Sequence, residues 1–159
     1  MANYDLLHST TLTVGSSNTL TISPIAGTYR DLILVTYLQG SNSNRINGNL
    51  NSDTGTNYSQ VSAQNDGGSS SSDSATSNDY FHAGVCTNNT WAVNTVQLMD
   101  YSSNDKHSVM LSHENAGTSR SGIRAMRWAN NAPVTSITIS TTAGTFDAGC
   151  TFKLFGIEA

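Results

Sequence analysis

Short apolar stretches that alternate with polar residues, each followed by turn-forming residues, run through almost the whole sequence. Alternation with a period of two is typical of β-strands, and the longer period of an amphipathic helix is nearly absent. The strongest stretch covers residues 29–39, and its centre at 32–35 is apolar at four successive positions. We expect a strand here that is covered on both faces.

The same pattern predicts an all-β domain over residues 1–159. Leu12, Val14, Leu20 and Ile22 surround a Gly-Ser-Ser-Asn turn and predict an N-terminal hairpin. Further strands are expected at 45–50, 58–63, 80–86, 92–100, 108–114, 122–128, 134–140 and 150–157. About ten short strands at this spacing, with no strand–helix rhythm, favour an antiparallel two-sheet β-sandwich that is jelly-roll-like.

Residues 64–79 interrupt this pattern. Gly67 and Gly68 precede four consecutive serines, and almost nothing in the segment is apolar. A segment of this length and composition is typical of a surface loop, so the sequence predicts a flexible Gly/Ser-rich loop here.

The surface is expected to be polar without being charged. Serine, threonine and asparagine supply 60 of the 159 residues, whereas charged residues make up 11% and the net charge is −4. Phosphate binding requires a basic patch, so the acidic balance argues against nucleic acid as a partner. No apolar run approaches the ~18–20 residues of a membrane span, so no membrane partner is expected.

Cys86 and Cys150 lie far apart in the sequence. The N-terminal residues lack the charged and apolar regions of a signal peptide. We therefore expect two reduced, buried thiols and no disulfide.

The histidines do not form a pattern suited to a metal. They are His8, His82, His107 and His113. His107 and His113 share a face of one predicted strand, but they lie about 20 Å apart at ~3.3 Å per residue. We expect surface or rim histidines, with no metal and no cofactor.

Catalytic patterns are also missing from the sequence. No serine occupies a Gly-x-Ser-x-Gly nucleophile elbow, and the only glutamates are Glu114 and Glu158. A glycosidase needs two carboxylates about 5–10 Å apart. The sequence therefore predicts a protein without enzymatic activity and without catalytic residues.

Asn51, Asp53, Gly55 and Asn57 alternate oxygen-bearing side chains with a glycine, as part of a calcium loop does. The early acidic cluster and the closing bidentate glutamate of such a loop are absent. An ordinary turn rich in Asn and Asp is the favoured interpretation.

Arg120, Arg124 and Arg127 are three of only seven basic residues, and Trp128 follows them directly. Arginine and tryptophan are enriched at the centres of protein interfaces, so these four residues form a candidate interface. The alternative is a solvated strand edge that carries positive charge against aggregation.

Tyr80, Phe81 and Trp91 are a second candidate binding group. Aromatic faces can stack on sugar rings, so the three could form a surface-binding platform. Core or interface residues are the favoured interpretation, because aromatic side chains most often serve packing.

Two segments resemble a known family. Arg45-Ile46-Asn47-Gly48, followed by residues 53–59 (Asp-Thr-Gly-Thr-Asn-Tyr-Ser), is similar to a stretch of small β modules in structural proteins of tailed bacteriophages, notably marine and cyanobacterial phages. The closing residues 133–139 and 146–157 and the Tyr-Arg-Asp-Leu at 29–32 resemble the same modules. This chain departs from the pattern by the four additional residues 49–52.

The resemblance implies a virion structural protein that is made in the host cytoplasm. Because the sequence begins at Met1 and ends just after the last predicted strand, we expect a free-standing module. That favours a capsid decoration (cement) protein, bound to the major capsid protein or other virion proteins as a homo-oligomer, by analogy a trimer. The alternatives are a tail-fibre or tail-appendage component contacting the host surface, and a lectin-like carbohydrate-binding module.

Overall fold

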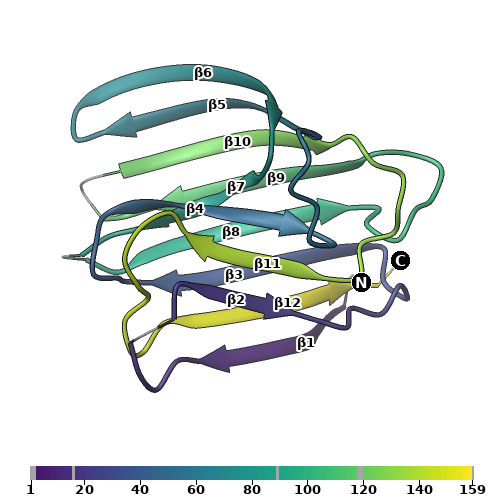
Figure 1. Cartoon of the computed structure of the whole chain (residues 1–159), viewed down its shortest axis with the longest axis horizontal. Helices are drawn as coiled ribbons and strands as arrows, with labels where there is room; N and C mark the ends of the chain where they lie inside the picture. The colour runs from purple at the N-terminus through teal and green to yellow at the C-terminus, as the bar shows by residue number, and fades with distance from the viewer. Residues whose placement is uncertain (1–2, 16, 89, 118–119, 159) are drawn as a thin grey trace.

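The computed structural model describes residues 3–15, 17–88, 90–117 and 120–158. These residues form twelve strands in two antiparallel sheets that pack face to face (Figure 1). The prediction of an antiparallel two-sheet β-sandwich is confirmed, with twelve strands instead of about ten. No helix in the described residues is long and apolar enough to cross a membrane.

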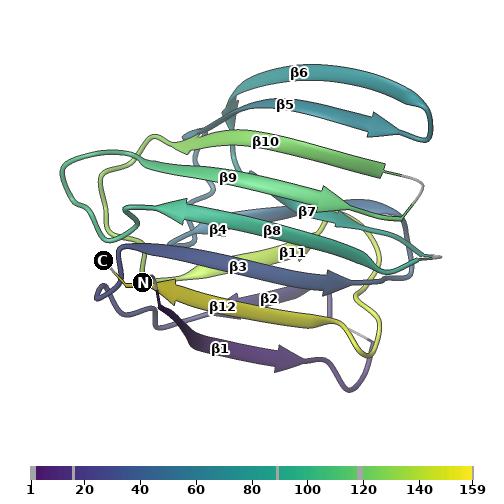
Figure 2. The ribbon, with the colours of Figure 1, turned by 180° about the vertical axis from the view of Figure 1, so that it is seen from behind.

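The larger sheet has eight strands in the spatial order β1 (Tyr4–Thr11), β12 (Thr151–Ile157), β3 (Asp31–Leu38), β8 (Ala92–Met99), β9 (Ser108–Asn115), β10 (Arg120–Trp128), β5 (Tyr58–Asp66) and β6 (Ser69–Asn78). The smaller sheet has the order β2 (Thr19–Ile22), β11 (Ile137–Thr141), β4 (Asn44–Leu50) and β7 (Phe81–Cys86). The ends of the chain lie side by side, because β1 pairs with β12 (Figure 2).

The predicted N-terminal hairpin is wrong. β1 pairs with β12 in the larger sheet, whereas β2 pairs with β11 in the smaller sheet. The connection therefore crosses from one sheet to the other, and Leu12 and Leu20 pack against the core at its two ends. A turn-rich sequence shows where the chain reverses, but it does not show whether the flanking strands pair.

The predicted loop at 64–79 is also wrong, because β5 and β6 form a regular hairpin. Gly67 and Gly68 form its two-residue turn with φ values of 58° and 107°, a conformation that favours glycine. The side chains of β6 are almost all exposed. A strand that buries no side chains has no apolar alternation, so its sequence resembles that of a loop.

The core lies between the sheets, and residues of the motifs at 29–32, 45–48, 53–59 and 146–157 help to build it. A Cβ added to Gly48 would lie 2.1 Å from Cζ of Phe81, and one added to Gly156 would lie 2.4 Å from Cγ of Tyr29. Only glycine allows these aromatic rings to lie directly on the backbone. The two glycines are therefore structural.

The Asp53 turn is a third structural element of these motifs. One carboxylate oxygen accepts hydrogen bonds from Nε1 of Trp128 at 2.7 Å and Nδ2 of Asn57 at 2.9 Å, and the other accepts the Gly55 amide at 2.8 Å. Burial acts to raise the pKa of Asp53, but these hydrogen bonds outweigh it and lower the pKa. The predicted Asn- and Asp-rich turn is confirmed, and its carboxylate ties the turn to the core tryptophan.

The larger sheet has one covered face and one open face. Leu32 and Leu34 of β3 are buried in the core, whereas Ile33 and Val35 are only half-buried on the opposite side. The prediction that this strand is covered on both faces is therefore wrong. Its side chains alternate between the core and a face with no second layer among the described residues.

The two cysteines are free and buried, as the sequence predicts. Burial raises the pKa of the Cys86 thiol to about 12 and also raises the pKa of Cys150.

Candidate functional site

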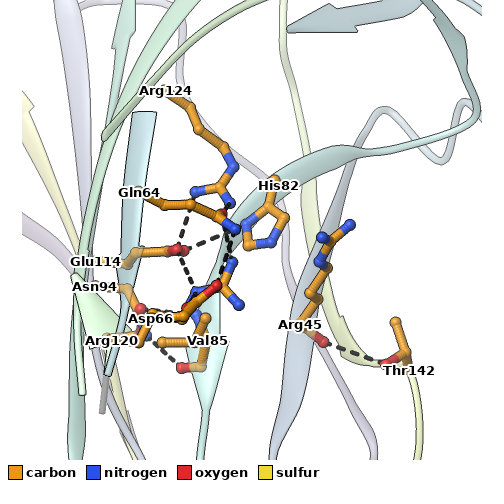
Figure 3. Close-up of polar contacts among 11 residues, drawn as sticks. Arg45, Gln64, Asp66, His82, Val85, Asn94, Glu114, Arg120, Arg124 and Thr142 are labelled. Carbon is orange, nitrogen blue, oxygen red and sulfur yellow. Dashed lines mark hydrogen bonds and ion pairs between the residues drawn. The ribbon is translucent and has the colours of Figure 1, made fainter. Parts of the chain in front are cut away.

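A cluster of polar side chains lies where β5, β9 and β10 of the larger sheet face β7 of the smaller one (Figure 3). We call it the ionic cluster, and it comprises Gln64, Asp66, His82, Glu114, Arg120 and Arg124. Glu114 is its centre, with a side chain that is 1% exposed. One of its carboxylate oxygens lies 2.9 Å from Nε of Arg120 and 3.0 Å from Nη1 of Arg124.

Gln64 joins the same two arginines from β5. Its side-chain oxygen accepts hydrogen bonds from Nη2 of Arg120 and from Nη2 of Arg124, each at 2.8 Å. Glu114 and Gln64 therefore hold both guanidinium groups from two sides. Burial lowers the pKa of Arg124, and the attraction of Glu114 opposes that effect. A buried charge of this kind requires a paired and hydrogen-bonded partner.

Asp66 is held much less firmly than Glu114. Its carboxylate lies 3.5 Å from Nε of Arg120, and its side chain is 46% exposed. It also accepts a hydrogen bond from Nε2 of Gln64 at 3.0 Å. The outer end of the ionic cluster is therefore open to solvent, whereas its inner end is closed.

His82 of β7 is completely buried, so the expectation of a surface or rim histidine is wrong for this residue. Its Nδ1 lies 3.5 Å from the second Glu114 oxygen, and neither ring nitrogen has a hydrogen-bond partner among the described residues. Burial first, and then the positive charges of Arg124, Arg120 and Arg45, lower the pKa of His82 to about 2. The imidazole is therefore neutral at physiological pH.

Asn94 on β8 completes the polar interior beside the cluster. Its side chain accepts a hydrogen bond from the Val85 amide at 2.8 Å and donates one to the Val85 carbonyl at 2.9 Å. These two bonds tie the edge strand β7 to the larger sheet. Within the described part of the chain, no group of three or more His, Cys, Asp or Glu side chains could hold a metal ion.

A groove of about 460 Å³ opens beside the ionic cluster. Its charged lining residues are Arg45, Asp66 and Arg120, and the polar residues around them are Ser43, Asn44, Thr87 and Thr142. We call this groove the mouth. Figure 3 shows Arg45 on β4, across His82 from the two clustered arginines.

The second feature is the open side of the larger sheet, which we call the outer face and which Figure 2 views from the front. A shallow groove of about 680 Å³ crosses it, lined in part by Val61, Leu111 and Ile123. These side chains are 62%, 47% and 59% exposed. Tyr37, Val93 and Val109 extend the exposed apolar area along neighbouring strands.

The strand register makes these residues one continuous surface. Val61 pairs with Ala125, which pairs with Leu111, so three neighbouring strands carry apolar side chains in one row. In the next row Ile123 lies between Ala63 and His113. Large exposed apolar patches are uncommon on monomeric proteins and mark interaction sites.

The structure separates the four predicted interface residues. Trp128 is fully buried in the core, Arg124 is buried in the ionic cluster, and Arg120 is half-buried at its edge. Buried side chains cannot contact a partner, so Arg124 and Trp128 are excluded as interface residues. Arg127 alone is exposed, and it lies on the outer face opposite Val109.

The three aromatic candidates do not form one platform either. Phe81 is buried in the core, with its ring centroid 6.2 Å from that of Tyr58. Tyr80 is half-buried beside it in the sequence. Trp91 instead stacks on Tyr37, with ring centroids 4.6 Å apart and an angle of 10° between the planes.

Neither the ionic cluster nor the outer face is predicted by the sequence patterns. The signal for the outer face was present at 108–114, where Val109 and Leu111 alternate with Met110, so that both sides of the strand are apolar. The signal for the cluster was weaker. Glu114 and His82 are distant in sequence and lie on different sheets, and only the packing of one sheet on the other brings them together.

No family model matches the chain, and no match was found among curated proteins. Among solved structures, galectin LEC-6 of Caenorhabditis elegans is 12% identical over 95% of this chain and 96% of that protein, with a TM-score of 0.41. Alginate lyase Aly36B is 11% identical over 95% and 79%, with a TM-score of 0.40. The PL-14 alginate lyase from Aplysia kurodai is 13% identical over 84% and 71%, with a TM-score of 0.36. These similarities concern the fold alone.

Proposed function

We propose that this chain is a non-enzymatic assembly module of a phage virion, a capsid decoration protein, which binds virion proteins through the outer face of its larger sheet. The observation that carries the proposal is the continuous apolar surface around Val61, Leu111 and Ile123. Burying such a surface against another protein gains roughly 25 cal/mol per Å² of apolar area.

The chemistry of this surface favours protein over sugar as the partner. Carbohydrate sites need several polar groups that match hydroxyls, together with an aromatic ring. The centre of the outer face has mainly valine, leucine, isoleucine and alanine side chains, and Ser72, Thr95, Gln97 and His113 also line the groove. Arg127 and Lys153 are exposed on the same face and contribute positive charge at its margins. An interface with an apolar centre and a charged rim is typical of protein–protein contacts.

The phage-like motifs support the virion as the setting. Gly48, Asp53 and Gly156 have structural roles in this fold, so the resemblance concerns how the module is built. We propose the major capsid protein as the partner and a homo-oligomer, by analogy a trimer, as the bound form. A tail-appendage location would use the same face against a different virion protein.

Sedimentation with purified capsids tests the proposal. Capsids stripped of this protein should bind it saturably, in a fixed ratio to the capsid protein, and should pellet with it. Native mass measurement of the free protein should give its oligomeric state in parallel. Failure to bind capsids, together with binding to host cells or glycans, would exclude the decoration function.

Carbohydrate binding is the second candidate, and one observation favours it. Tyr37 is 41% exposed and stacks on the half-buried Trp91 at one end of the outer face. A flat aromatic pair of this kind could support a sugar ring. A glycan array that includes a Trp91→Ala variant separates this candidate from the first, because only lectin-like binding requires the aromatic pair.

A further inference from the structure

We propose that the mouth binds a small hydroxylated anion, such as a uronic acid or a sugar phosphate, whose anionic group sits between Arg45 and Arg120. The mouth lies between the sheets and not on the outer face, so this site is independent of the proposed docking surface. Three features carry the inference: the surplus of positive charge, the weakly held Asp66, and the polar lining.

Positive charge exceeds negative charge around the mouth. Three positive charges, those of Arg45, Arg120 and Arg124, lie close enough to His82 to lower its pKa. Among the described residues, only two carboxylates, Glu114 and Asp66, form ion pairs within the ionic cluster. Arg45 is exposed, and its guanidinium makes no hydrogen bond or ion pair with another described residue. Arginine binds carboxylate and phosphate groups through paired N–H donors, so Arg45 is suited to an incoming anion.

Asp66 marks the position that the anion would occupy at Arg120. Its carboxylate lies 3.5 Å from Nε of Arg120, longer than a good charge-assisted hydrogen bond. Nε of Arg120 already donates its one hydrogen to Glu114 and Nη2 donates to Gln64, so the guanidinium is held in place. Nη1 has no hydrogen-bond partner among the described residues and is the donor left for a ligand beside Asp66. A half-exposed carboxylate in this position can be displaced by a ligand that pairs with two arginines.

The rest of the mouth suits hydroxyl groups. Ser43, Thr87 and Thr142 contribute hydroxyls, and Asn44 contributes an amide. A volume of about 460 Å³ fits a monosaccharide-sized ligand in the range of ordinary small-molecule sites. Val85 and Cys86 also line the mouth, so a ligand would combine apolar contact with the charge and hydrogen bonds of the residues around them.

Calorimetric titration of the purified protein tests this site. The probes are glucuronate, glucose 6-phosphate and neutral glucose, each at the same ionic strength set with sodium chloride. We expect saturable binding of one or both anions and none of glucose; which anion binds more tightly distinguishes a carboxylate from a phosphate ligand. Arg45→Ala should weaken binding by about tenfold or more, because a charge-assisted pair is lost.

Two further variants make the test specific. Asp66→Asn should tighten binding several-fold, because it removes the competing carboxylate. Arg127→Ala removes an exposed arginine outside the mouth and should leave binding unchanged. The proposal is overturned if neither anion binds saturably, or if Arg45→Ala and Arg127→Ala weaken binding equally, since only general screening would then be measured. The titration uses no capsids, so its outcome is independent of the proposed docking function.

Discussion

Arg124 of β10 and Glu114 of β9 form an ion pair inside the sandwich, with Nη1 and Oε1 separated by 3.0 Å and side chains that are 2% and 1% exposed. Arg120 shares the same carboxylate oxygen. A single buried carboxylate is therefore shared by two guanidinium groups at the point where the smaller sheet ends. This pairing explains why two of the seven basic residues of the chain serve the interior rather than the surface.

Replacing that carboxylate should strongly destabilise the protein. Glu114→Gln keeps the size of the side chain but leaves Arg124 and Arg120 without their buried countercharge. Breaking a buried pair by removing one partner typically costs about 3–5 kcal/mol. Urea unfolding of the variant should show this loss. Glu158→Gln, at an exposed glutamate, is the matched control, and equal stability of the two variants would contradict the account.

His82 should make the protein less stable as the pH falls. Its pKa is lowered to about 2 in the folded state from an ordinary value of 6.5. Between these values the unfolded chain binds a proton at this residue and the folded chain does not. The free energy of unfolding should therefore decrease by up to about 1.4 kcal/mol per pH unit below about pH 6.5.

Urea unfolding over a series of pH values measures this slope, and His82→Gln removes its contribution. The free energy of unfolding of the variant should fall less steeply with decreasing pH than that of the wild type. The difference should be up to about 1.4 kcal/mol per pH unit, which is the contribution of one proton. Equal slopes would show that His82 is protonated in the folded protein, against the neutral imidazole inferred from its burial.

Asp53 should stabilise the fold at neutral pH and lose that effect in acid. Because its pKa is lowered below the ordinary 3.8, the contribution is complete above that value and is lost as the pH falls through the folded-state pKa. Asp53→Asn weakens the bond from Trp128 and should cost about 1–2 kcal/mol at neutral pH. Unfolding followed by tryptophan fluorescence should show this difference disappearing in acid. Asp79→Asn, at an exposed aspartate, should be as stable as the wild type at every pH.

Gly48 should tolerate no side chain. In Gly48→Ala the new methyl group would lie 2.1 Å from Cζ of Phe81, so the ring or the strand must move. Overpacking of this kind costs about 1–3 kcal/mol. Thermal or urea unfolding measures the loss. Gly27→Ala is the control, because its added Cβ would meet Cβ of Ser102 at an ordinary 3.5 Å; equal effects of the two changes would contradict the packing argument.

The strand positions could largely be predicted from the sequence, because each strand of the core buries every second side chain. In β10 this alternation places Met126 and Trp128 inside and Ile123 outside. β6 could not be predicted, since it buries almost nothing and is held by backbone hydrogen bonds to β5. Which strands pair also could not be predicted, as the separation of β1 from β2 illustrates.

The candidate sites were harder to predict for the same reason. Arg124 and Ile123 are adjacent in the sequence, yet one points into the ionic cluster and the other onto the outer face. The sequence showed a local excess of arginine but not the direction of each side chain. That direction depends on which face of the strand meets the smaller sheet, and this is settled by long-range pairing.

The most direct test of the account is the binding of an outer-face variant to capsids. Ile123→Asp places a charge at the centre of the outer face, whereas Val14→Asp makes the same kind of change at a valine that is 70% exposed in the loop between β1 and β2. Circular dichroism should show both variants folded. We predict that Ile123→Asp weakens capsid binding by about tenfold or more, as loss of a hot spot does, and that Val14→Asp binds like the wild type. Undiminished binding of folded Ile123→Asp would contradict docking through the outer face.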